Sequence, residues 1–68
     1  MSYVEFRDSI QADLKRSPSG KTWKELQQSL NLPYKRPCPE WVGRLEREIG
    51  LLRDARRGSA LVWRVALP

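Results

Sequence analysis

Residues 20–26 read GKTWKEL, and this stretch fixes the start of a helix. Thr22 and Glu25 have the spacing of a capping box, in which each side chain accepts a hydrogen bond from the other residue's backbone amide. Apolar residues then recur at helical spacing as far as Asn31, which suits the left-handed residue that often ends a helix. The pattern predicts a helix over about residues 22–31.

A second helical pattern precedes this stretch. Apolar side chains recur there at intervals of three or four residues: Tyr3, Phe6, Ile10 and Leu14. This periodicity predicts a helix over about residues 2–16, with Glu5, Asp8 and Asp13 on its other faces. The segment Ser17–Gly20, which contains a proline and a glycine, ends it.

A third helix is expected over about residues 39–49. Pro39 suits the first helical position, and apolar residues follow every four positions: Trp41, Leu45 and Ile49. Gly50 is placed to end the helix. The connection before it, residues 32–38, is stiffened by two prolines.

The C-terminal part predicts a β-hairpin over about residues 51–66. A short first strand leads into a polar turn at residues 54–59, and apolar and polar residues alternate after Ala60. Leu61, Trp63 and Val65 share one face of that second strand. We therefore expect residues 1–68 to form one α+β domain, with its three tryptophans in the core.

The charge is concentrated in the second half of the chain. Thirteen Lys and Arg stand against eight Asp and Glu, a net charge of +5. Residues 1–34 have a net charge of +1 and residues 35–68 a net charge of +4. A basic half on so small a domain favours a polyanionic partner, although an excess of surface charge also serves solubility.

This order of elements, with residues 20–26 opening the second helix, resembles a winged-helix domain. The resemblance implies a short strand before the second helix, a recognition helix at residues 39–49 that enters the major groove of duplex DNA, and a wing at residues 54–59. The proline-rich connection departs from the short turn of the helix-turn-helix motif. A single domain has a small footprint, so tight binding would require a homodimer or tethering to a larger protein.

Candidate DNA contacts follow from the resemblance and from the chemistry of arginine and lysine. On the third helix, the expected base contacts are Glu40, Gly43, Arg44 and Arg47. The expected phosphate contacts are Lys21, Lys24, Lys35, Arg36, Arg56 and Arg57. Simpler roles compete: Arg44 and Arg47 can pair with Glu40 or Glu48, and Arg56 and Arg57 can merely keep a hairpin tip soluble.

Other functions fit the sequence less well. The chain has no histidine and a single cysteine, Cys38, so we expect no enzyme, no metal, no cofactor and no small-molecule substrate. No membrane segment or signal peptide is visible, which favours the cytoplasm, or the nucleoid in a bacterium. A protein-interaction module is the main alternative, because three glutamates of the third helix suit a phosphate surface poorly. Binding of RNA or of a single strand ranks third, since such binding usually needs exposed aromatic platforms and Tyr34 is the one plausible example.

Overall fold

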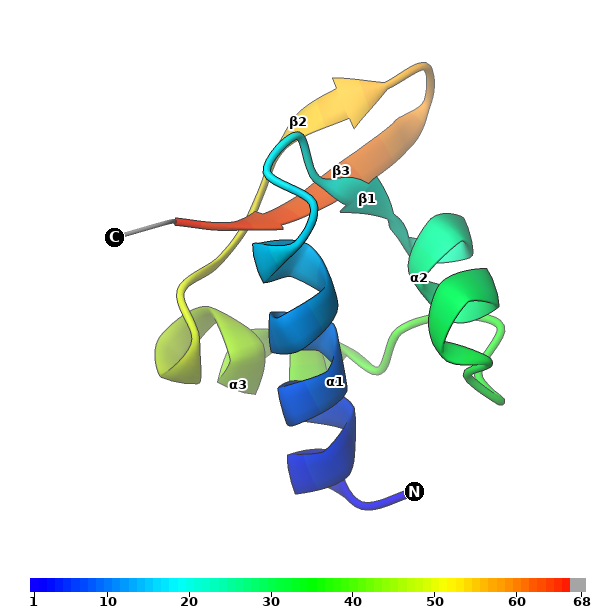
Figure 1. Cartoon of the computed structure of the whole chain (residues 1–68), viewed down its shortest axis with the longest axis vertical. Coiled ribbons are helices and arrows are strands. Elements are labelled where there is room, and N and C mark those ends of the chain that lie inside the picture. Colours follow the sequence, from blue (N-terminus) through cyan, green and yellow to red (C-terminus); the bar gives the residue numbers. More distant parts are fainter. Residues whose placement is uncertain (67–68) are drawn as a thin grey trace.

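Three helices and three strands account for most of residues 1–66, the part of the chain that the computed structural model describes (Figure 1). In chain order they are α1 (Tyr3–Lys15), β1 (Lys21–Thr22), α2 (Trp23–Leu30), α3 (Pro39–Glu48), β2 (Leu51–Arg57) and β3 (Ala60–Val65). The strands form an antiparallel sheet in the order β1-β3-β2. The chain is therefore a small α+β domain, and each helix begins and ends within one residue of the expected bounds.

The helix ends have the capping interactions that the sequence predicts. The Thr22 hydroxyl accepts a hydrogen bond from the Glu25 amide, and the Glu25 carboxylate accepts one from the Thr22 amide. Asn31 ends α2 in the left-handed conformation, with φ of 53°. Pro39 opens α3, but the preceding residue, Cys38, makes no side-chain capping bond.

The hairpin differs from the expected one in the length of its first strand. Residues 54–57 were expected in the turn, but they belong to β2, and the turn is confined to Gly58 and Ser59. The pairing shifts register between Leu52 and Ala55, where β2 bulges. Residues 54–57 are exposed, so this part of the strand lacks the apolar–polar alternation by which half-buried strands are predicted.

The core lies between α1, α2, α3 and the sheet. Its fully buried large side chains are Phe6, Ile10, Leu14, Leu26, Leu45 and Trp63. Trp63 thus lies in the core as predicted, whereas Trp23 and Trp41 are only partly buried and pack against the edge of the core. Partial burial leaves these two indole rings available to line hollows at the surface.

Asp13 corrects the expectation that the carboxylates of α1 all point away from the core. Its side chain is buried, with a relative exposure of 5% for the residue. The Lys21 ammonium donates to both carboxylate oxygens at 3.0 and 2.9 Å, and the Ser29 hydroxyl donates at 2.7 Å. Partners from β1 and α2 compensate for the lost hydration of the carboxylate, and a helical periodicity read from α1 alone does not reveal them.

Candidate nucleic-acid interface

A shallow groove of about 450 Å³ runs between the start of α2 and the β2–β3 hairpin. Its apolar floor is made by Trp23, Leu61 and Trp63. Its cations are Lys24, Arg53 and Arg56, and no carboxylate in the described chain lines it. We call this the basic groove.

One of the two tryptophans of the basic groove contacts Arg53. Trp23 opens α2, and its ring lies 5.2 Å from that of Trp63. The Arg53 guanidinium lies over the Trp63 ring at 5.4 Å, a cation–π contact. Its Nε atom is buried, and within residues 1–66 it has no hydrogen-bond partner. The Trp63 ring therefore sets where the Arg53 guanidinium lies in the groove.

Arg53 is a site residue that the sequence analysis did not identify. It falls in the first strand of the hairpin, and the sequence pattern assigns it to that strand without indicating a contact. The bulge between Leu52 and Ala55 surrounds Arg53, and bulges commonly redirect a side chain. The charged run Arg53-Asp54-Ala55-Arg56-Arg57 is the sequence feature from which a basic contact could be predicted. It does not show which of its arginines enters the groove.

The two arginines expected at the hairpin tip behave differently. Arg56 lines the basic groove and donates a hydrogen bond to the Ser59 carbonyl across the turn at 3.1 Å. Arg57 forms an ion pair of 2.8 Å with Glu25, which ties the hairpin to the start of α2. The hydrogen bond from the Thr22 amide, aided by the charge of Arg57, lowers the pKa of Glu25. The charge of Arg57 is thus compensated, whereas Arg56 forms no ion pair with any other residue of the described range 1–66.

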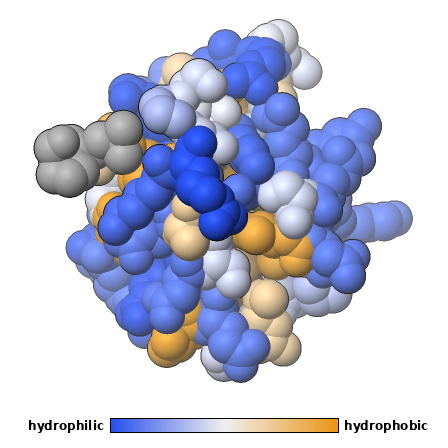
Figure 2. Space-filling model, in the orientation of Figure 1, coloured by the Kyte–Doolittle hydropathy of each residue, from blue (hydrophilic) through white to orange (hydrophobic). Residues whose placement is uncertain are grey.

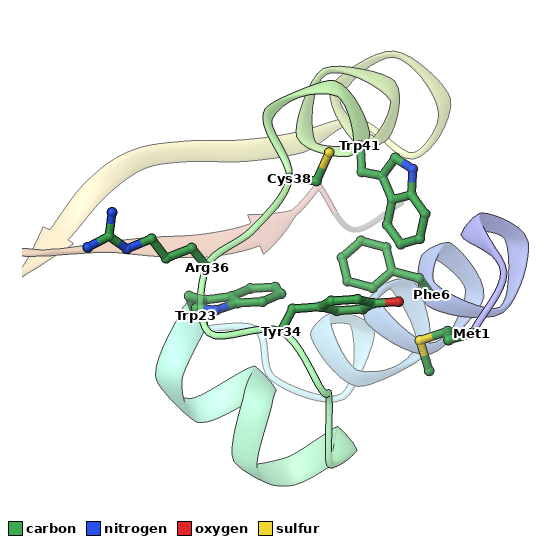
Figure 3. Close-up of a pocket in the computed structure, with 7 residues that line it drawn as sticks. All are labelled: Met1, Phe6, Trp23, Tyr34, Arg36, Cys38 and Trp41. Carbon is green, nitrogen blue, oxygen red and sulfur yellow. The ribbon is translucent and has the colours of Figure 1, made fainter.

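A second hollow, of about 320 Å³, shares Trp23 with the basic groove (Figure 3). We call it the aromatic pocket; its lining residues are Met1, Phe6, Trp23, Tyr34, Arg36, Cys38 and Trp41. The Trp23 indole N–H donates to the Lys35 carbonyl at 2.9 Å, and the Gln27 amide donates to the Tyr34 carbonyl at 2.9 Å. These bonds fix the proline-rich connection against α2 and so place Lys35 and Arg36 beside Trp23.

The surface of α3 has mixed charge. Arg44 forms an ion pair with Glu48 at 3.2 Å, which is the simpler role expected for it as an alternative to a base contact. Its guanidinium lies 3.8 Å from the centre of the Tyr3 ring. Glu48 also accepts a hydrogen bond from Arg7 at 2.9 Å, and this bond is the main cause of its lowered pKa. Arg44 therefore belongs to a contact between α3 and α1.

The other expected base contacts lie on the exposed side of α3. Arg47 is exposed and has no ion-pair partner within residues 1–66. It lies next to Gly43, where an added Cβ would come within 3.6 Å of the Arg47 guanidinium. Glu40 and Glu46 are exposed on the same helix. In Figure 1, α3 and the hairpin tip lie at opposite ends of the molecule, so Arg47 and Arg56 do not form one cluster.

The structure thus brings together only some of the residues that were expected to contact DNA. Lys24 and Arg56 share the basic groove, and Arg36 lines the aromatic pocket, which has Trp23 in common with that groove. Lys21 instead forms the part-buried ion pair with Asp13, and its side chain has a relative exposure of 23%. We therefore leave Lys21, Arg44 and Arg57 out of the candidate interface.

Hydrophilic residues cover most of the face shown in Figure 2, with small apolar patches between them. Within the part of the chain described, no group of three or more potential metal ligands occurs, and no helix combines the length and apolarity needed to span a bilayer.

Comparisons of the chain with known protein families, curated proteins and solved structures find no match.

Proposed function

We propose that the chain is a winged-helix domain that binds duplex DNA, as a small regulator or as the DNA-targeting module of a larger protein. Three helices, a short strand before the second helix and a C-terminal hairpin are the elements that this resemblance implies. Because fold alone does not determine function, the proposal depends on the surface.

The observation that carries the proposal is the basic groove. Lys24, Arg53 and Arg56 line it, and none of them forms an ion pair within residues 1–66. Duplex DNA carries closely spaced phosphates, so a binder needs several uncompensated cations on one surface. Arginine suits this role because its planar guanidinium can hold a phosphate through two hydrogen bonds.

In this proposal the hairpin and the start of α2 bind the backbone, and α3 contributes a smaller contact than the sequence suggests. Lys24, Arg53 and Arg56 neutralise phosphates, with Lys35 and Arg36 at the edge of the same surface. Arg47 is the cation of α3 that remains open to a base or phosphate. Arg44, stacked on Tyr3, orients α3 and stays off the DNA.

The test is fluorescence anisotropy with a mixed-sequence duplex over a series of salt concentrations. We expect a log–log slope of about −3 or steeper for the wild-type chain, since each phosphate contact contributes about −0.9. Lys24→Ala and Arg56→Ala should each weaken binding to every sequence and make the slope shallower by about 1. Lys15→Ala removes an exposed lysine of α1 that does not line the groove, and should leave the slope unchanged. Absence of binding at low salt would refute the proposal.

A protein-interaction module is the second candidate, and the mixed charge of α3 favours it. Glu40 and Glu46 would meet phosphates unfavourably if α3 entered the major groove. Glu40→Gln with Glu46→Gln should therefore tighten DNA binding if α3 approaches the duplex. If α3 contacts a protein while the groove alone holds DNA, this double variant should leave the affinity for DNA unchanged.

A further inference from the structure

We propose that the aromatic pocket binds one unpaired nucleobase of a DNA whose neighbouring phosphates lie in the basic groove. This inference rests on the proposed function, because the groove must first hold the backbone. It adds a preference for a structural feature of the DNA, which the basic groove alone would not give.

The size and the aromatic lining of the pocket suit a single ring. Trp23 and Trp41 lie at opposite sides of the hollow, with Phe6 and Tyr34 between them (Figure 3). Phe6 packs against Trp41 at 5.0 Å and against Trp23 at 6.1 Å, so the rings support one another. The volume of about 320 Å³ is near the lower end of small-ligand sites, which begin at about 300 Å³.

The charge around the pocket favours a ring that carries a phosphate. Arg36 is at the rim, and its side chain extends outward from the rings (Figure 3). Trp23 lines both the pocket and the basic groove, so Lys24, Arg53 and Arg56 lie just beyond this shared ring. No carboxylate within residues 1–66 lines either hollow. An apolar side chain of a partner protein would fill the pocket but would leave these cations without a function.

The chemistry of the pocket predicts stacking with little choice among bases. The Trp23 indole N–H is already bonded to the Lys35 carbonyl, and so the partly exposed Trp23 ring offers aromatic surface to the pocket and no free donor. Every base has such a face to stack on, so aromatic platforms tolerate different sequences. A base within an intact duplex cannot reach the pocket without breaking its pairing and stacking, whereas a bulged base is already unpaired.

The experiment compares two fluorescein-labelled duplexes that are identical except for one bulged thymine. We expect the bulged duplex to bind on the order of tenfold more tightly, the effect of stacking one base on an aromatic side chain.

Cys38 offers a way to block the pocket without changing a core residue, because it is the single cysteine, is exposed and lines the pocket. Alkylation with N-ethylmaleimide should abolish the preference and retain binding to the paired duplex. The Cys38→Ser chain, measured with and without the same reagent, is the matched control; the reagent should leave its relative affinity for the two duplexes unchanged.

Each other outcome has a distinct meaning. If the untreated chain binds both duplexes equally, the pocket does not take a base, while the proposed function stands. If the preference for the bulge survives alkylation, it arises elsewhere on the surface and the pocket assignment is wrong. If neither duplex binds, both the inference and the proposed function fail, and a protein partner becomes the better explanation of the pocket.

Discussion

At the scale of single residues, Asp13 is the charged side chain whose removal should cost most. Its carboxylate is buried and bonded to Lys21 and Ser29, so Asp13→Ala leaves an ammonium and a hydroxyl without their acceptor. Breaking a fully buried pair costs about 3–5 kcal/mol. Because Lys21 is 23% exposed and can reach water, we expect a loss of about 2–3 kcal/mol in the free energy of unfolding, measured with urea.

Asp8→Ala is the matched control on the same helix. Asp8 pairs with Arg7 at 3.0 Å, but its side chain has a relative exposure of 60%. Exposed pairs contribute little, so the change should cost less than about 1 kcal/mol. Equal losses for the two variants would show that the Asp13 network adds nothing beyond a surface pair.

Cys38 gives a second prediction at this scale, in the opposite direction. It is the N-cap of α3 but makes no side-chain capping bond, whereas serine is a favoured N-cap. We expect Cys38→Ser to stabilise the domain by about 0.5–1 kcal/mol, seen as a higher urea midpoint. Cys38→Ala, which cannot cap, should show no such gain; if both variants change stability alike, the serine hydroxyl is not capping α3.

At the scale of the elements, the helices could be predicted from sequence because their ends are determined locally. The capping box of Thr22 and Glu25 and the left-handed Asn31 lie within or next to α2 itself. The length of β2 could not be predicted, because residues 54–57 are exposed and charged and depend on pairing with β3. One of the contacts that hold this strand, Arg57 with Glu25, joins residues far apart in the sequence and leaves no local pattern.

The packing of the turn before β1 against β3 gives a prediction at this same scale. Gly20 has a φ of +86°, and a Cβ there would overlap a methyl group of Val62 and come 2.8 Å from the Trp63 carbonyl oxygen. Gly20→Ala should therefore add a steric clash to the cost of a left-handed alanine, about 3 kcal/mol in all. Urea unfolding would measure this loss.

Gly58→Ala separates the two costs. Gly58 has a similar φ of +66°, but nothing lies within 4 Å of an added Cβ. Its loss should be that of the backbone conformation alone, about 1–2 kcal/mol. If Gly20→Ala cost no more than Gly58→Ala, β3 would have room to move away from the turn.

At the scale of the whole molecule, the sequence indicates that the surface is basic but not where the free charges gather. The excess of cations in residues 35–68 can be counted directly. Which cations of the chain remain uncompensated depends on long-range pairs, such as Arg57 with Glu25 and Arg7 with Glu48. The basic groove therefore combines Lys24 and Arg56, which were expected at the surface, with Arg53, which was not.

The same long-range pairs make the stability of the whole domain depend on pH. Three carboxylates that link different elements have lowered pKa values. Burial alone would raise the pKa of Asp13, but hydrogen bonds from Ser29 and Lys21 outweigh it. The Thr22 amide lowers the pKa of Glu25, and Arg7 lowers that of Glu48. The unfolded chain, with ordinary values of 3.8 for Asp and 4.5 for Glu, therefore binds protons more readily on acidification.

A lowered folded-state pKa contributes stability that is complete above the unfolded pKa and is lost as the pH falls through the folded value. We expect the urea midpoint to be level above about pH 5.5 and to fall progressively below about pH 4.5, at constant ionic strength. Asp13→Asn removes one of the three titrating groups, so its midpoint should start lower at neutral pH and fall less steeply in acid. A wild-type midpoint that stayed level down to pH 2 would mean that these carboxylates interact equally in the folded and unfolded chain, and that the pairs do not hold the elements together.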